Sequence, residues 1–132
     1  MTVIRGRPVG GASVQHSATF TGTVWADPLL PKTDGVAISN IFFPPQAHSN
    51  WHQHENGQIL MITAGSGFVC DQGEEPSQIN AGDLVWLPAG GTHWHGASPT
   101  SYLVQLSFTL GTTTWKEPVS EEEYDKAVRA LS

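Results

Sequence analysis

The residues best suited to chemistry gather in one stretch, HSNWHQHENGQILMITAGSG, which spans residues 48–67. In an extended strand, residues two apart point to the same face, so His52 and His54 are expected to project together. The short irregular segment 55–57 can then bring the side chain of Gln58 close to these two imidazoles. Neutral imidazole nitrogens and an amide oxygen are suitable ligands for a divalent metal. The stretch therefore indicates one half of a metal site.

A second histidine pair follows about 40 residues later, in the segment GDLVWLPAGGTHWHG at 82–96. His93 and His95 again share one face of an extended chain. Two such pairs, each entering or leaving a strand, would meet across a small barrel. We expect one divalent ion to be bound by His52, His54, Gln58 and His93. The isolated His16 and His48 are expected to be surface or hydrogen-bonded residues, although His48 could also lie at a site rim.

His95 is the candidate catalytic residue, because it follows a ligand by two residues and points into the same cavity. It could accept and donate a proton, or it could only hold the metal ligands in position without taking part in the reaction. The walls of the cavity are expected to come from apolar and small polar residues of the neighbouring strands. The candidates for these walls are Ile38, Phe42, Leu60, Leu103, Gln105 and Ser107.

The elements that must position these side chains are short strands. Segments rich in β-branched and aromatic residues alternate with turn formers, a pattern typical of an all-β sandwich or barrel. We expect a single domain over 1–132, with an N-terminal arm at 1–17 and an antiparallel β-barrel at 18–110. The predicted strands are 19–27, 35–43, 58–63, 67–72, 77–79, 83–88 and 101–110.

The last segment, VSEEEYDKAVRALS, breaks the strand pattern and predicts one α-helix over 120–131. Ser120 followed by Glu123 forms a capping box, and acidic residues occupy the first turn. Tyr124, Val128 and Leu131 recur at helical spacing and form one apolar stripe. We expect this stripe to pack on the barrel or on a partner subunit.

The composition restricts the classes of partner. The chain has 132 residues, a formal net charge of −6 and only six Lys and Arg, so nucleic acid is an unsuitable partner. No apolar segment is long enough to span a membrane, and the N-terminus lacks the apolar core of a signal peptide. Cys70 is the only cysteine and is expected to be a small buried residue rather than a nucleophile. These features predict a cytoplasmic protein.

The two histidine segments resemble the two motifs of the cupin superfamily. The first is His52-x-His54, three residues, Gln58, six residues and Gly65, with Gln at the usual Glu position. The second is Gly82, five residues, Pro88, x, Gly90, two residues and His93, with Ala97 at the usual Asn position. The 16 residues between Gly65 and Gly82 match a compact single-domain cupin. The resemblance implies a cupin-type barrel, the double-stranded β-helix or jelly roll.

Three further segments, FTGTVWADPL, GQILMITAGSG and GDLVWLPAGGTHWHGASPT, look like those of small manganese-dependent cupins that act as hydroxynitrile lyases. This likeness implies a metal held by His52, His54, Gln58 and His93, with Mn or Fe first and Ni, Co or Zn as alternatives. It also supports a homodimer. One departure concerns the last long strand, where Gln105 stands in place of a pocket histidine of these relatives.

Three functions are consistent with such a site. In a metal-dependent lyase, a substrate oxygen binds the metal, His95 takes the proton and an adjacent C–C bond breaks. An iron or manganese dioxygenase would use the same ligands and bind O₂ at an open position. A non-enzymatic cupin that binds a small molecule would have little need for four convergent ligands. The hydroxynitrile lyase type of reaction on a small organic substrate is the sharpest expectation.

Overall fold

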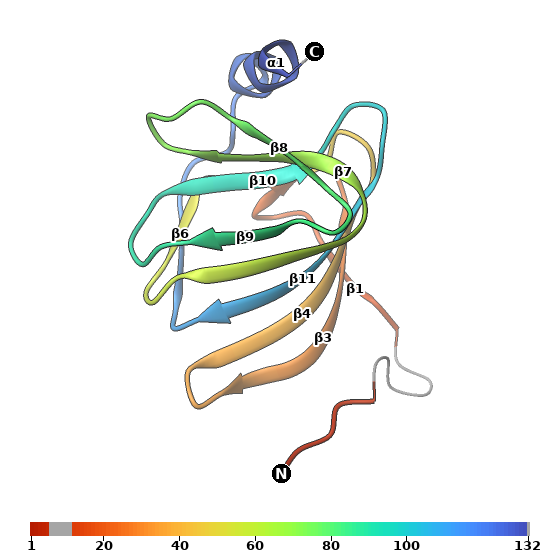
Figure 1. Ribbon diagram of the computed structural model, residues 1–132, viewed down its shortest axis with the longest axis vertical. Coiled ribbons are helices and arrows are strands. Elements are labelled where there is room, and N and C mark those ends of the chain that lie inside the picture. The colour runs from red at the N-terminus through yellow and green to blue at the C-terminus, as the bar shows by residue number, and fades with distance from the viewer. Residues whose placement is uncertain (6–11, 132) are drawn as a thin grey trace.

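The computed structural model describes residues 1–5 and 12–131. Its described part consists of short strands and one helix, in the chain order shown in Figure 1. The strands are β1 (Val14–His16), β2 (Phe20–Thr21), β3 (Val24–Thr33), β4 (Val36–Phe43), β5 (His48–Ser49), β6 (His52–His54), β7 (Gln58–Asp71), β8 (Ser77–Asn80), β9 (Leu84–Leu87), β10 (His93–Ala97), β11 (Leu103–Leu110) and β12 (Thr113–Trp115). The helix is α1 (Glu121–Ala130).

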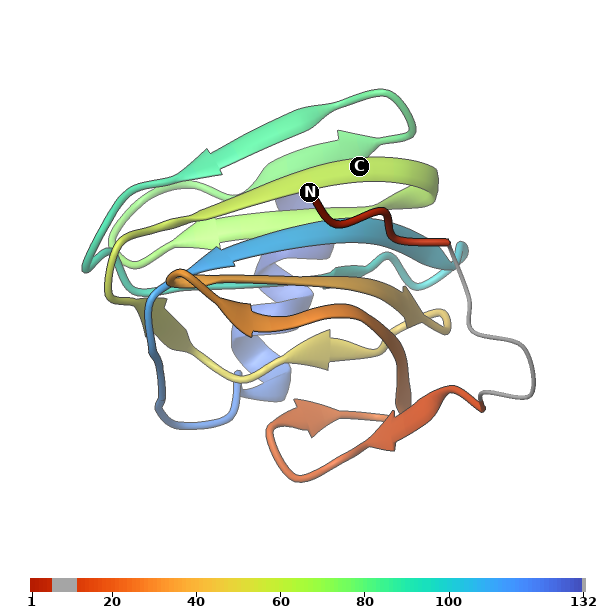
Figure 2. The ribbon, with the colours of Figure 1, turned by 90° about the horizontal axis from the view of Figure 1, so that it is seen from below.

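The strands form a nearly closed antiparallel barrel made of two curved sheets that share β7. The first sheet has the order β1-β3-β4-β11-β7-β9. In the second sheet β10 lies beside β7 and pairs with both β5 and β6, while β8 pairs with the far part of β7. The curvature that closes the barrel is visible from below in Figure 2. The expected all-β barrel with one C-terminal helix is confirmed.

Several predicted strands have other ends in the structure. The segment 19–27 is divided into β2 and the start of β3. The segments 58–63 and 67–72 belong to one continuous strand, β7, because Gly65 bends the chain without ending it. Gly65 has a φ of +77°, and a methyl group there would collide with the carbonyl oxygen of Tyr102. β3 continues to Thr33 through a segment that resembles a turn. Its prolines are tolerated because β1 pairs only with Val24–Ala26, which leaves one edge of the rest of β3 free.

The apolar core lies between the two sheets. Its buried members are Val24, Phe43, Ala47, Leu60, Ile62, Ile79, Leu87, Ala97 and Leu103. Strand β1 lies inside the segment expected to be an arm, and β12 follows the expected end of the barrel at residue 110. β12 pairs with β6, the strand that carries two of the candidate ligands. The extra strand therefore supports the site directly.

Helix α1 begins after the predicted capping box. The Ser120 hydroxyl accepts a hydrogen bond from the Glu123 amide at 3.1 Å, and the Glu123 carboxylate accepts one from the Ser120 amide at 2.9 Å. The Tyr124 hydroxyl donates to the Ala97 carbonyl at 2.8 Å, which ties the helix to β10. Val128 and Leu131 pack with Tyr124 on a second apolar cluster, so the helical stripe faces its own barrel. No helix in the described ranges is long and apolar enough to cross a membrane.

Candidate metal centre

The four histidines of the two His-x-His pairs meet at one place inside the barrel. His52 of β6 and His93 of β10 are register partners, and their ring centroids are 4.4 Å apart. The ring of His54 lies 4.9 Å from that of His52 and 5.3 Å from that of His93. His52, His93 and His95 each place one ring nitrogen within 4.8 Å of the others, a spacing at which three histidines can hold a metal ion.

Each candidate ligand is held by a hydrogen bond on the side away from the cluster. The Nδ1 atoms of His52 and His93 lie 2.8 Å from the Asn50 carbonyl and 3.2 Å from the Gly91 carbonyl. Because a carbonyl can only accept, these contacts place the proton on Nδ1 and leave Nε2 with a free lone pair. The strand pairings give similar support to the other two candidates: Thr113 Oγ1 lies 2.9 Å from His54 Nδ1, and Gln58 Nε2 donates to Thr109 Oγ1 at 3.0 Å.

Three side-chain atoms of the candidate ligands have no hydrogen-bond partner in the protein. His54 Nε2, Gln58 Oε1 and His93 Nε2 are buried and make no hydrogen bond within the protein. Buried polar atoms are normally satisfied, and each unsatisfied one costs about 1–3 kcal/mol. Three such atoms, two of them on rings that lie within 5 Å of the His52 ring, fit a bound divalent cation. The donor set of nitrogen and neutral oxygen also suits a first-row divalent metal.

The protonation of the cluster favours metal binding at neutral pH. Burial, reinforced by the neighbouring His93, lowers the pKa of His52 to about 3. Burial also lowers the pKa values of His54 and His93 to about 4. All three imidazoles are therefore neutral near pH 7, which is the form that binds metals.

His95 lies beside the cluster and has a partner of its own. Its ring centroid is 5.2 Å from that of His52, and burial holds its pKa well below the ordinary value. Its Nδ1 is 3.2 Å from Nε2 of Gln105, which also donates to Ser107 Oγ at 3.1 Å. An amide offers both a donor and an acceptor, so Gln105 can pair with either neutral tautomer of His95. Nδ1 is thereby fixed, and Nε2 is the ring atom left for chemistry.

A hollow of about 250 Å³ opens next to these side chains. It is bordered by His52, His54, Gln58 and His95, by apolar residues and by small polar ones. The apolar part of its lining consists of Phe20, Val24, Ala26, Ile41 and Trp115. His16, which is expected to be a surface or hydrogen-bonded residue, also borders the hollow. The site thus combines a metal-type ligand set with a small, largely apolar space.

None of the candidate wall residues belongs to the lining of this hollow as described. Phe42 is 39% exposed, and it and Ile38 lie on the outer side of the barrel. Leu60 and Leu103 are fully buried in the core cluster. Gln105 and Ser107 are buried behind His95, where they hold its ring without bordering the hollow.

The sequence left the orientation of β4 undecided. Its two alternating sets, Val36-Ile38-Asn40-Phe42 and Ala37-Ser39-Ile41-Phe43, are almost equally apolar, so periodicity does not tell the inner set from the outer one. The structure places Ser39 and Ile41 at the hollow. The contribution of Phe20 and Trp115 was also missed. Phe20 lies in the predicted strand 19–27, which the structure divides into β2 and the start of β3, and Trp115 lies in β12, a strand of three residues that was not predicted.

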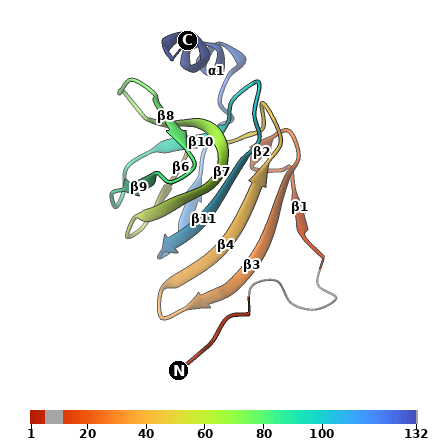
Figure 3. The same ribbon diagram turned by 45° about the vertical axis from the view of Figure 1, so that its right-hand side comes forward.

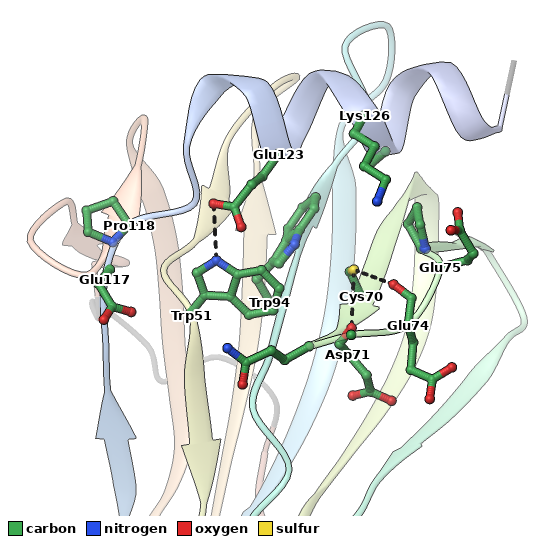
Figure 4. Close-up of a pocket in the computed structure, with 14 residues that line it drawn as sticks. Trp51, Cys70, Asp71, Glu74, Glu75, Trp94, Glu117, Pro118, Glu123 and Lys126 are labelled. Atoms are coloured by element: carbon green, nitrogen blue, oxygen red, sulfur yellow. Dashed lines mark hydrogen bonds between the residues drawn. The ribbon is translucent and has the colours of Figure 1, made fainter.

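A second hollow of about 470 Å³ lies between α1 and the turn after β7 (Figure 4). The Trp51 indole donates to the Glu123 carboxylate at 3.4 Å on one side of it. Cys70 lines it, and its thiol lies 3.5 Å from the Asp71 carbonyl and 3.6 Å from the Glu74 carbonyl. Burial, together with the charge of Asp71, raises the pKa of this half-buried thiol. Cys70 is therefore unsuited to be a nucleophile near neutral pH.

Comparison with known proteins identifies the class. Residues 41–106 match the family model described as the cupin domain, and these residues include all four histidines of the cluster. The chain belongs to the cupin family.

The chain is similar to a named enzyme and to two proteins of known structure. The chain is 40% identical over 111 residues to the (R)-mandelonitrile lyase of Granulicella tundricola, a match that covers 80% of this chain and 85% of the relative. It is also similar to the crystal structure of a cupin-like protein from Thermotoga maritima, with a TM-score of 0.83 and 36% identity over 86% of this chain and 91% of the other. A predicted oxalate decarboxylase from the same organism, with a TM-score of 0.73, 23% identity and coverage of 84% and 100%, shares the fold.

Proposed function

We propose that this protein is a metal-dependent lyase that cleaves small cyanohydrins, as a hydroxynitrile lyase does. The observation that carries the proposal is that unpartnered buried ligand atoms of His54 and Gln58 belong to residues that line a small, largely apolar hollow, which His95 also lines. The 40% identity to a mandelonitrile lyase over most of both chains supports this class of reaction. The substrate class is a small aldehyde cyanohydrin with an apolar substituent.

His52, His54, Gln58 and His93 are the residues that would hold the metal. Their four donors carry no charge, since the imidazoles are neutral and Gln58 is an amide. Mn²⁺ or Fe²⁺ suits this set first, with Ni²⁺, Co²⁺ or Zn²⁺ as alternatives. When bound, such an ion supplies a Lewis acid whose positive charge is not reduced by any protein carboxylate.

The walls of the hollow select and orient the substrate. Phe20, Val24, Ile41 and Trp115 offer an apolar surface to a substituent and exclude water from the reacting groups. The polar end of a cyanohydrin then lies toward the histidines. A volume of about 250 Å³ restricts the substrate to a small molecule.

His95 moves the proton. Its neutral Nε2 accepts the hydroxyl proton of the cyanohydrin, the bond between the carbinol carbon and the nitrile carbon breaks, and a carbonyl group forms. Cyanide leaves with the electron pair of that bond and then takes the proton from His95, so that an aldehyde and HCN are released. Gln105 keeps the imidazole in place during both transfers by its contact with Nδ1.

The metal assignment is tested by elemental analysis of the wild type and of the His52→Ala/His54→Ala double variant. We expect one divalent ion per chain in the wild type and little in the variant, with the far-UV circular dichroism spectrum unchanged. Trp51→Ala/Gln53→Ala is a matched control, because it alters the alternating residues of the same segment. Full metal retention in the first variant would falsify the ligand set.

The reaction is tested by following release of aldehyde from mandelonitrile with the metal-loaded protein. His95→Ala should lower kcat/KM roughly 10²-fold or more, the usual effect of losing a general acid or base, while the metal content stays at the wild-type level. Wild-type rates in this variant would remove His95 from the mechanism. Oxygen uptake that accompanies turnover would instead assign the protein to the dioxygenases.

A further inference from the structure

The hollow of about 470 Å³ beside α1 lies on the other side of β10 from the histidine cluster. Successive residues of a strand face opposite ways, so the alternation that directs His93 and His95 into the barrel directs Trp94 out of it. Trp94 is the register partner of Cys70 on β7, and both side chains line the hollow. Helix α1 lies at the β8 and β10 end of the molecule, where its Ala127 forms part of the same lining (Figures 1 and 3). The two hollows have no lining residue in common as described, so this one is separate from the candidate metal centre.

Trp94 carries a hydrogen-bond donor that the protein leaves unused. Its side chain is 1% exposed, yet its Nε1–H group has no hydrogen-bond partner among residues 1–5 and 12–131. The buried polar atoms that the protein encloses completely without a partner do not include this nitrogen, so it keeps access to the hollow that Trp94 lines. The indole of Trp51, in contrast, donates to Glu123. Buried indole N–H groups normally have a partner, so the free donor of Trp94 indicates a ligand atom with a lone pair in the hollow.

The charged groups of the lining restrict the charge of that ligand. One ammonium group, that of Lys126, stands against five carboxylates, which leaves a net four negative charges. The carboxylates are those of Asp71, Glu74, Glu75, Glu117 and Glu123. Glu123 is engaged by the start of α1 and by Trp51. The other carboxylates and Lys126 form no ion pair within the ranges that the structure describes, so the lining attracts a cation and has free acceptors for it.

These charges act together at one point of the hollow. Burial raises the pKa of the Cys70 thiol, and the charge of Asp71 raises it further. Lys126 lowers this pKa, whereas Glu123 and Glu75 raise it. Charged groups of α1 and of the turn after β7 are therefore all close enough to influence one side chain of the lining. The negative charge is concentrated around the hollow from two elements that are distant in the sequence.

We propose that this hollow binds a small organic cation that carries a carbonyl oxygen close to its ammonium group, as a basic amino acid amide does. The unpaired carboxylates of Glu74 and Glu75 accept hydrogen bonds from the ammonium group, and the Trp94 N–H group donates to the carbonyl oxygen. A bare metal ion has no lone pair to offer the indole, and an anion is repelled by the net charge, so neither fits the lining. The volume of about 470 Å³ lies within the range of about 300–1,000 Å³ typical of sites for small organic ligands.

Isothermal titration calorimetry with three related probes tests the ligand chemistry. The first probe, L-lysinamide, has two amino groups and a carboxamide; 1,5-diaminopentane lacks only the carboxamide, and hexanamide lacks only the two amino groups. We expect lysinamide to bind about fivefold more tightly than 1,5-diaminopentane, which is the usual effect of one hydrogen bond, and hexanamide not to bind measurably. Absence of lysinamide binding, or a diamine that binds equally well, would overturn the proposal.

Two pairs of substitutions separate the hollow from the general acidity of the protein. Glu74→Gln/Glu75→Gln removes two exposed charges of the lining and should weaken lysinamide binding about fivefold or more. Glu121→Gln/Glu122→Gln is the matched control, because it removes two exposed carboxylates of the first turn of α1 that do not line the hollow. The control should keep the wild-type affinity. Equal weakening by both pairs would show an unspecific attraction of cations and overturn the proposal.

Trp94→Phe tests the unused donor, because it keeps an aromatic ring and removes the N–H group. It should lower the affinity for lysinamide to that for 1,5-diaminopentane and leave the affinity for the diamine unchanged. Comparing the two probes in the two proteins isolates the hydrogen bond from any change in packing. The same loss for both probes would exclude a hydrogen bond from Trp94 to the carbonyl oxygen.

The indole N–H signals in a ¹⁵N NMR spectrum locate the bound probe in the wild type, with Zn²⁺ supplied because it is diamagnetic. Addition of lysinamide should move the signal of Trp94 and leave those of Trp25 and Trp115, which do not line the hollow, in place. Another hollow, across the turn 71–76, borders Glu74 and Glu75 together with Trp86. Binding there would move the Trp86 signal, leave that of Trp94 unchanged and overturn the proposal. Lyase activity enters none of these measurements, so their outcome is independent of the proposed reaction.

Discussion

Each imidazole of the candidate centre uses its two nitrogens for different purposes. The Nδ1 atoms of His52, His54 and His93 contact a backbone carbonyl or a threonine hydroxyl. The Nε2 atoms of His54 and His93 are left without a protein partner. Such an arrangement fixes both tautomer and ring orientation before a metal arrives, which reduces the cost of ordering the ligands on binding.

Gln58 controls the charge of the centre. Its amide contributes a neutral oxygen, so replacement by Glu would add one negative charge at the same position. We expect Gln58→Glu to keep the metal, because a carboxylate is the stronger ligand, and to lower kcat for cyanohydrin cleavage. The physical reason is that the added charge weakens the attraction of the metal for electrons of the substrate oxygen.

Metal content and steady-state kinetics measured together check this prediction. Gln53→Glu is the matched control, because Gln53 lies between the two histidines on β6 but is directed toward Thr92. The control should retain the wild-type kcat. Equal activity of Gln58→Glu and the wild type would show that charge at this ligand does not limit the reaction.

At the scale of elements, α1 is held at its first turn and on one apolar side. The capping box supplies partners for amides that a helix leaves unsatisfied at its start. Glu123 also accepts the Trp51 indole, so one carboxylate joins the helix start to the barrel. The helix lies outside the hollow that contains the histidines, and its contribution is to stability.

Removing the cap should therefore lower stability without affecting catalysis. We expect Ser120→Ala to reduce the free energy of unfolding by about 1 kcal/mol, the usual cost of losing such a residue. Urea unfolding of the metal-free protein measures this value. Ser77→Ala, which changes an exposed serine on β8, is the control and should have little effect. A loss of lyase activity in Ser120→Ala at temperatures where it is fully folded would contradict the purely stabilising role.

At the scale of the whole molecule, burying the histidines makes folding depend on pH. The pKa of His52 is about 3 in the folded protein, and those of His54 and His93 are about 4. The unfolded chain has ordinary histidines with a pKa near 6.5. As the pH falls below 6.5, protons therefore bind the unfolded chain first, and the free energy of unfolding decreases.

We expect the metal-free protein to be most stable above about pH 6.5 and to lose stability steadily from there toward about pH 4. Urea unfolding in the presence of a chelator between pH 7.5 and 5 checks this, in a range where ordinary carboxylates titrate little. The His52→Ala/His54→Ala variant should have a shallower dependence, since two of the titrating groups are gone. A wild-type stability that stays constant down to pH 5 would contradict the buried, neutral state of the cluster.

Much of the fold follows from the sequence alone, because it depends on short-range rules. The two His-x-His pairs, their glycines and Pro88 lie at fixed spacings, and strand parity by itself directs each pair to one face. The capping box at Ser120 specifies the start of the helix through contacts within four residues. The family and the antiparallel barrel with its C-terminal helix could be predicted for this reason.

Only the tertiary structure decided which residues surround the histidines and which lie outside. The alternating sets of β4 are almost equally apolar, although one lies inside the barrel and the other lies on its outer side. For this reason the sequence did not show that Phe42 lies on the outer side of the barrel. The support of His54 by Thr113 and of His95 by Gln105 joins positions 59 and 10 residues apart. Such pairs depend on the register of strands across the barrel. Register arises from contacts between distant segments, so a local sequence pattern does not predict it.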